Sequence, residues 1–79
     1  MAETLSLVAR TRAEKGLTLR DLSMLSGVSI NAIGDLERRR RPNQHLKTIY
    51  RVAQALGLSF EDVLIDLAEG WKRDEEKAS

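Results

Sequence analysis

Residues 18–36, TLRDLSMLSGVSINAIGDL, decide the fold of this chain. Thr18 can accept a backbone N–H bond as the N-cap of a helix, and Asp21, three residues later, can accept a bond in return. This pairing is a weak capping box. It predicts a helix that begins near Leu19.

This helix has an apolar face and a defined end. Leu22 and Leu25 are three residues apart and share a face, while Ser23 is small enough to let another helix approach. Gly27 follows, and a glycine just beyond an apolar face can take the left-handed conformation that ends a helix. The chain is therefore expected to turn at Gly27.

A second short helix is expected directly after the turn. Val28 fills the corner, Ser29 can cap the new helix, and Ile33 with Leu36 forms its buried stripe. Two amphipathic helices around one glycine are typical of a helix-turn-helix, which presents its second helix to a DNA groove. An αα-hairpin of an ordinary helical protein is the alternative.

The charge distribution favours DNA over that alternative. Residues 1–60 carry ten Lys or Arg against five Asp or Glu, a net charge of +5, and residues 61–79 carry three against seven, a net charge of −4. Four arginines in a row, Arg38–Arg41, follow the second helix, and His45 lies in the same basic stretch. Such a patch attracts polyanions, although a solvated loop that keeps the protein soluble is the competing interpretation.

The rest of the chain predicts three more helices. The first runs from Glu3 to Lys15 with Leu5 and Val8 among its inner residues, and the fourth covers 46–56 with apolar residues at 46, 49, 52, 53 and 56. The fifth follows Ser59, its inner stripe being Phe60, Val63, Leu64 and Leu67. The glycines are interpreted as helix punctuation: Gly16, Gly27, Gly34, Gly57 and Gly70.

The prediction is thus an all-α, five-helix domain over residues 1–70 with a charged C-terminal tail, 71–79, of which 72–79 is expected to fray. Trp71 either extends the stripe of the fifth helix and closes the core, or lies at a subunit contact, where tryptophan is favoured.

Composition argues against several other classes of protein. The chain has no cysteine and one histidine, so no metal site is expected, and it has no glycine-rich phosphate loop. Glu61 and Asp62 are sequence neighbours that point in different directions on a helix, so they are not a catalytic pair. The apolar runs are short and the N-terminus lacks the pattern of a signal peptide. We expect a cytoplasmic protein that is not an enzyme, with no cofactor, small-molecule ligand or membrane partner.

From about Leu5 to Leu67, the order of elements resembles the phage repressor and Cro-like helix-turn-helix family, also called the XRE family. The resemblance implies a lambda-repressor-like fold and a pair between Arg12 and Glu37 that joins the first and third helices. The residues that carry it are Arg12, Gly16, Leu17 and Thr18 at the entry, the core set Leu22, Gly27, Val28, Ser29 and Ile33, then Leu36 with Glu37, and the stretch Ala55–Leu64.

By position, the resemblance places the base-reading side chains at Ile30, Asn31, Gly34 and Asp35. The carboxamide of Asn31 can pair bidentately with adenine, Ile30 can pack on a thymine methyl, and Asp35 can accept from a cytosine N4. Gly34 in mid-helix costs about 1 kcal/mol relative to alanine, which hints that DNA backbone or another helix approaches closely there.

A second set of residues is expected to contact the DNA backbone: Thr18, Leu19, Arg38, Arg39, Arg40, Arg41 and His45. Leu19 stands where the family usually has a glutamine, so only its backbone N–H can bind a phosphate. Arg39 stands where the family usually has a glycine, and the arginines compensate by neutralising phosphates or entering a minor groove.

The resemblance implies a sequence-specific regulator that binds double-stranded DNA as a homodimer. The dimer surface is expected on the fifth helix, with Phe60, Leu67 and Trp71 as candidates. Phage repressors, controller proteins of restriction-modification systems and antitoxins share this build. The alternative is a protein-interaction module of the same fold with little direct DNA reading, because Leu19, Ile30 and Asp35 on the expected DNA face also suit a protein partner.

Overall fold

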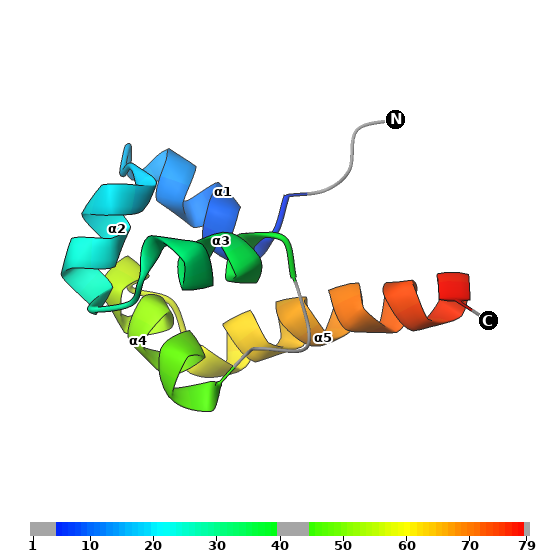
Figure 1. Ribbon diagram of the computed structural model, residues 1–79. Helices are drawn as coiled ribbons and strands as arrows, with labels where there is room; N and C mark the ends of the chain where they lie inside the picture. Colours follow the sequence, from blue (N-terminus) through cyan, green and yellow to red (C-terminus); the bar gives the residue numbers. More distant parts are fainter. Residues whose placement is uncertain (1–4, 40–44, 79) are drawn as a thin grey trace.

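Five helices make up the structure, which is a computed structural model describing residues 5–39 and 45–78, with side chains described as far as Arg73. The helices are α1 (Leu7–Glu14), α2 (Leu19–Ser26), α3 (Ile30–Glu37), α4 (Leu46–Leu56) and α5 (Phe60–Ala78). Neither described range contains a strand. The all-α, five-helix prediction is confirmed (Figure 1).

The first helix begins later than the sequence suggested. Ser6 has an extended backbone and accepts the N–H of Ala9 at 3.2 Å, so it caps a helix that starts at Leu7. Val8 is buried as expected, but Leu5 precedes the cap and is 60% exposed. The prediction that Leu5 lies on the inner side of a helix from Glu3 is therefore wrong for Leu5, while Glu3 is outside the described residues.

The capping box at the start of α2 is confirmed. Thr18 Oγ1 accepts the N–H of Asp21 at 3.0 Å, and Asp21 Oδ2 accepts the N–H of Thr18 at 3.0 Å. These bonds to Thr18 hold the pKa of the Asp21 carboxyl below its ordinary value, because they favour its charged form. The helix start is thus fixed by groups three residues apart in sequence.

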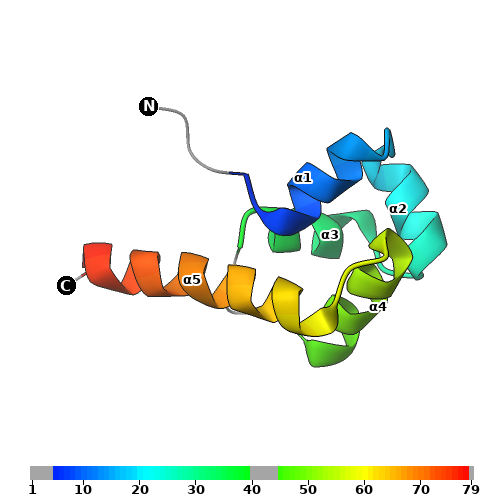
Figure 2. The ribbon, with the colours of Figure 1, turned by 180° about the vertical axis from the view of Figure 1, so that it is seen from behind.

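The core lies where α2, α3 and α4 meet α1 and α5, and each helix contributes to it. Figure 2 shows the bundle from behind, with α2 at one end and α5 extending away from it. Burying these apolar side chains supplies the main favourable term for folding. The buried members are Val8, Leu22, Val28, Ile33, Leu36, Ile49, Val52, Ala53, Leu56, Val63 and Leu67.

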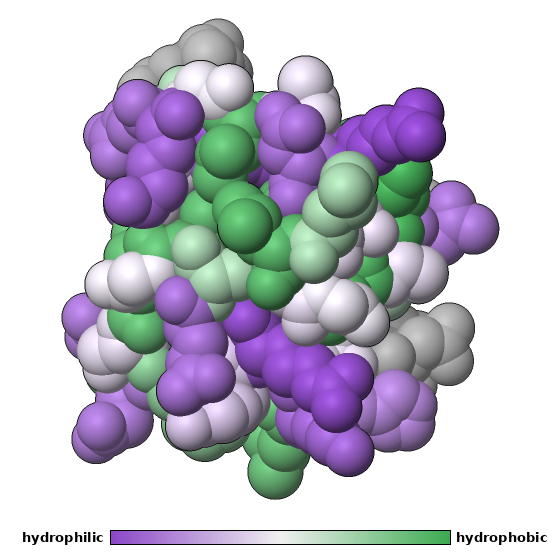
Figure 3. Space-filling model, turned by 90° about the vertical axis from the view of Figure 1, so that its left-hand side faces the viewer, coloured by the Kyte–Doolittle hydropathy of each residue, from purple (hydrophilic) through white to green (hydrophobic). Residues whose placement is uncertain are grey.

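Two leucines expected in this core are exposed instead. Leu25 is 62% exposed, because the inner side of α2 is formed by Leu22 with Leu19, and Leu25 falls on the flank. Leu46 is 65% exposed in the first turn of α4, beyond the part of the core that starts at Ile49. The end of the molecule formed by α2 and α4 consequently shows apolar side chains between charged ones (Figure 3).

The last helix is longer than predicted. α5 continues to Ala78, so residues 72–78 are helical rather than frayed, and Figure 1 shows this helix reaching beyond the other four. Gly34 and Gly70 lie inside α3 and α5 and are buried, so they are not helix punctuation. Within the described ranges, no helix combines the length and the apolar character needed to cross a membrane.

Candidate nucleic-acid interface

The turn between α2 and α3 is built from local contacts. Gly27 takes a left-handed conformation with φ +73°, and the Ser23 hydroxyl donates to the carbonyl of Val28 at 2.6 Å. Ser29 then accepts the N–H of Ala32 at 3.2 Å and caps α3. These contacts fix the angle between the two helices of the motif.

The outer face of α3 carries the polar side chains singled out in the sequence. Ile33 and Leu36 are 0% exposed on the inner side, while Asn31 is exposed and Ile30 is 45% exposed. Asp35 is one turn after Asn31 and is partly buried. A helix that is buried on one side and polar on the other can place its outer side chains against a groove.

The end of this face combines a negative and a positive charge. Arg38 Nη1 lies 3.8 Å from Asp35 Oδ1, and the two side chains are 64% and 30% exposed. A pair this exposed contributes little to stability. Its effect is to place a guanidinium beside the one carboxylate on the outer face of α3.

Gly34 does not lie open on this face. It is buried, and a Cβ built on it would stand 3.6 Å from Nη1 of Arg38. The nearest group to such a Cβ is thus the side chain of Arg38, which caps the end of the same helix. As a base-reading position, Gly34 is covered in this structure.

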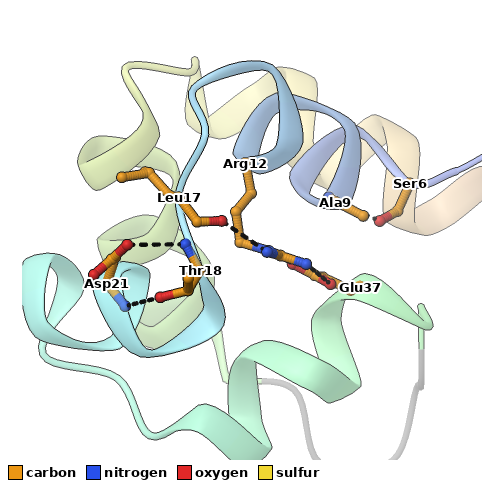
Figure 4. Close-up of polar contacts among 7 residues, drawn as sticks. All are labelled: Ser6, Ala9, Arg12, Leu17, Thr18, Asp21 and Glu37. Carbon is orange, nitrogen blue, oxygen red and sulfur yellow. Dashed lines mark hydrogen bonds and ion pairs between the residues drawn. The ribbon is translucent and has the colours of Figure 1, made fainter.

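Arg12 of α1 and Glu37 at the end of α3 form a two-pronged ion pair. Arg12 Nε donates to Glu37 Oε2 at 2.5 Å, Nη2 donates to Oε1 at 3.2 Å, and Nη1 donates to the carbonyl of Leu17 at 2.8 Å (Figure 4). The pKa of Arg12 is raised, because the bond to Glu37 outweighs the opposing effect of burial. The pair ties the end of α3 to α1, as the resemblance implied.

Arg39 does not face outward as Arg38 does. Its guanidinium lies 2.9 Å from Asp66 of α5, and its side chain is only 13% exposed. Its φ of +55° is left-handed, which fits the glycine that the resemblance leads one to expect at this position. Since the guanidinium is held by Asp66, we correct the prediction that Arg39 contacts the DNA backbone. Arg40 and Arg41 lie outside the described residues.

The remaining backbone candidates lie at helix starts. The side chain and N–H of Thr18 are both used in the capping box, while Leu19 packs its side chain against the core. His45 is exposed at the N-cap of α4, and the first helical turn behind it carries the exposed Lys47. For Leu19, the backbone N–H remains the group suited to a phosphate.

Of the three dimer candidates, Leu67 is 0% exposed and part of the core, so placing it at a dimer surface was wrong. Phe60 is partly buried and meets Tyr50 edge-on, with ring centroids 5.8 Å apart. Trp71 packs against the core, and its Nε1 donates to the carbonyl of Arg39 at 2.9 Å. The structure therefore supports the core-closing alternative for Trp71.

Sequence reasoning missed Asp66 entirely. It pairs with Arg39, and its Oδ2 accepts the N–H of Leu7 at 3.0 Å. A signal was present: Asp66 stands three residues after Val63 and directly before Leu67, both fully buried, so it borders the inner stripe of α5. A carboxylate at such a border needs a partner.

Among the described residues, no group of three or more metal-ligating side chains is close enough to hold a metal ion. The buried side-chain nitrogen and oxygen atoms of this part of the chain all have hydrogen-bond partners. The polar side chains left to interact with a partner are those on exposed surfaces.

Comparison with known proteins agrees with this geometry. A family model described as helix-turn-helix matches residues 8–63. An uncharacterized HTH-type transcriptional regulator, y4dJ, from Sinorhizobium fredii is 45% identical over 56 residues, which is 71% of each chain. The crystal structure of the clp gene regulator ClgR from C. glutamicum is 40% identical and superposes with a TM-score of 0.60, covering 78% of this chain and 79% of that one. The chain belongs to the XRE family of helix-turn-helix transcriptional regulators.

Proposed function

We propose that this protein is a sequence-specific DNA-binding regulator that lays α3 in the major groove as a homodimer. The observation that carries the proposal is the outer face of α3, on which Asn31, Asp35 and Arg38 follow one another while the inner face is locked into the core. The helix is held at both ends, by Ser29 and by Glu37. A preorganised face loses little entropy on binding.

Three side chains of α3 are proposed to read bases. Asn31 is exposed and can pair with N6 and N7 of adenine, and Ile30 can contact a thymine methyl. Asp35 can accept from a cytosine N4 while Arg38, its weak partner, moves to a phosphate. Gly34 is left out of this set because it is buried and has no side chain with which to contact a base.

Phosphate contacts are assigned to the basic residues around the end of α3 and to one helix terminus. Arg38, Arg40, Arg41 and His45 supply side chains, and Leu19 supplies its backbone N–H at the start of α2. Such contacts position the protein without reading sequence. Their signature is a steep loss of affinity with rising salt.

One α3 helix reads only a few base pairs, so specificity calls for two copies related by a twofold axis, with recognition helices about 34 Å apart. The exposed side of α5 is proposed as the contact between copies. It carries Ile65, which is 59% exposed, whereas Phe60 and Trp71 lie on another side of α5 and pack against the core. An apolar side chain this exposed on the longest helix suits an isologous contact.

The test is a selection of bound duplexes from a random library, followed by fluorescence anisotropy on the recovered site. We expect a palindrome, whose two halves report the twofold assembly. Asn31→Ala should relax discrimination at one base pair by about five- to 150-fold, corresponding to about 1–3 kcal/mol. Arg38→Ala is the matched control: it should weaken binding to all duplexes alike and lower the salt slope by about one.

Equal loss on the selected site and on random duplex for Asn31→Ala would contradict its base-reading role. Absence of any salt-dependent association at low ionic strength would remove the whole proposal. The protein-interaction module is then the second candidate. Met24 and Leu25 favour it, because these neighbouring apolar side chains of α2 are 77% and 62% exposed.

A further inference from the structure

Arg39 stands at an unusual junction in the chain. It follows α3 directly after Arg38, and its φ of +55° is a conformation that residues other than glycine rarely adopt. A non-glycine residue stays in such a conformation when the surrounding contacts require it. The contacts of Arg39 should therefore explain why the chain leaves α3 in this direction.

Both the guanidinium and the backbone carbonyl of Arg39 are held by residues of α5. Its Nη2 donates to Asp66 Oδ1 at 2.9 Å, and its Nε lies 3.3 Å from Oδ2. Its carbonyl accepts the indole N–H of Trp71 at 2.9 Å. The side chain and the backbone are thus fixed separately, by two residues on neighbouring turns of one helix.

The side chain also fits against α5 along its length. A Cβ built on Gly70 would stand 2.2 Å from Cδ of Arg39 and 3.2 Å from its Cβ, so only glycine leaves room for the arginine stem. Asp66 is fixed in turn, because its Oδ2 accepts the N–H of Leu7 at the start of α1. Three helices converge on this carboxylate and its arginine.

We propose that Asp66, Gly70 and Trp71 are positioning residues for DNA binding, which act by holding Arg39 and so fix the end of α3, where Arg38 lies directly before it. Asp66, Gly70 and Trp71, together with Arg39 itself, are called the Arg39 anchor. The inference rests on the proposed function, because it gives α5 control over the phosphate contact assigned to Arg38 at the end of α3. It also assigns Arg39 itself to holding the chain and not to gripping a phosphate.

The anchor is tested with two conservative variants. Trp71→Phe keeps an aromatic ring but removes the N–H that bonds to Arg39, and Asp66→Asn keeps the shape of the carboxylate but removes its charge. The control is Asp62→Asn, an exposed aspartate one turn earlier on α5. It makes the same charge change as Asp66→Asn, so it measures how much one added positive charge alone tightens DNA binding.

The measurement is the affinity for one random-sequence duplex by fluorescence anisotropy at several salt concentrations, at a temperature where circular dichroism shows each variant folded. We expect Trp71→Phe to bind about three- to tenfold more weakly than the unchanged protein, with a shallower salt slope because fewer phosphates are neutralised. Asp66→Asn should bind more weakly than Asp62→Asn by a similar factor. Should Asp66→Asn fail to fold, Trp71→Phe decides alone.

A merely structural role for the anchor would lower the melting temperature and leave the affinity of the folded variants unchanged, which would overturn the proposal. Tighter binding by Asp66→Asn than by Asp62→Asn would also overturn it, since Arg39 would then grip DNA once released. If the unchanged protein shows no salt-dependent binding, both the proposed function and the role of the anchor are contradicted. If only the variants show no effect, the proposed function stands and the anchor alone is lost.

Discussion

The two ends of α3 are held by different kinds of contact. At its start, Gly27 turns the chain and Ser29 caps the helix, through bonds that span no more than a few residues. At its end, Glu37 pairs with Arg12, 25 residues away, and Arg39 pairs with Asp66, 27 residues away. The start is fixed by local backbone chemistry, and the end by ion pairs that exist only in the assembled bundle.

This difference predicts how each end responds to substitution. A substitution at the start should lower the free energy of unfolding by about the contribution of one helix cap or one strained residue, because the groups that lose their partner stay in contact with water. A change at the end leaves a partly buried charge without its partner, and the cost is larger.

Removing the charge at the end of α3 should have the largest effect. We expect Glu37→Gln to lower the free energy of unfolding by about 2 kcal/mol, below the value for fully buried pairs because the side chains of Arg12 and Glu37 are 22% and 14% exposed. The matched control is Asp35→Asn on the same helix, whose exposed pair should cost less than about 1 kcal/mol. Urea unfolding measures both, and equal losses would contradict the distinction between the two pairs.

A substitution in the turn at the start of α3 should lower the free energy of unfolding by less than Glu37→Gln does. Gly27→Ala forces a side chain into φ +73°, which should lower the free energy of unfolding by about 1 kcal/mol, although nothing lies within 4 Å of the added Cβ. Thermal unfolding by circular dichroism checks this. A loss as large as that of Glu37→Gln would show that the turn is as demanding as the long-range pair.

The same division explains what the sequence could predict. Thr18 with Asp21, Gly27 and Ser29 act on neighbours within four residues, so their residue types and spacing were enough to place both helices of the motif. Asp66 could not be assigned in this way, because its partner depends on how α5 packs against the rest of the bundle.

Helix rotation limited the sequence reading in a related way. An apolar residue three positions from a core residue lies on the same broad face, yet Leu25 is on its edge and exposed, while Leu22 is buried. In the candidate site, the sequence could predict that Asn31 is exposed, because Ile33 and Leu36 form the buried stripe on the other side of α3. It could not predict the burial of Gly34, because that depends on where the long Arg38 side chain lies.

The two mid-helix glycines should respond in opposite directions. Gly34→Ala meets the side-chain tip of Arg38 at 3.6 Å, an ordinary contact distance, so the higher helix propensity of alanine should stabilise the protein by about 0.5–1 kcal/mol. Gly70→Ala gains the same propensity but displaces the stem of Arg39, so it should destabilise. The melting temperatures of the two variants test whether their stabilities change in opposite directions. Stabilisation by both would mean that Arg39 can leave α5 without cost.

The smallest expected effect belongs to the capping box of α2, because the Asp21 carboxylate is fully exposed and screened by water. Its pKa is lowered by the bonds to Thr18, so its charged form stabilises the fold above the unfolded pKa of about 4. That stabilisation disappears as the pH falls through the lower folded value. Asp21→Asn should therefore melt at a lower temperature than the unchanged protein at pH 5–7, and the gap should close below about pH 4. A gap that stayed constant down to pH 2 would show that the charge of Asp21 contributes nothing, and that the geometry of the box alone holds the start of α2.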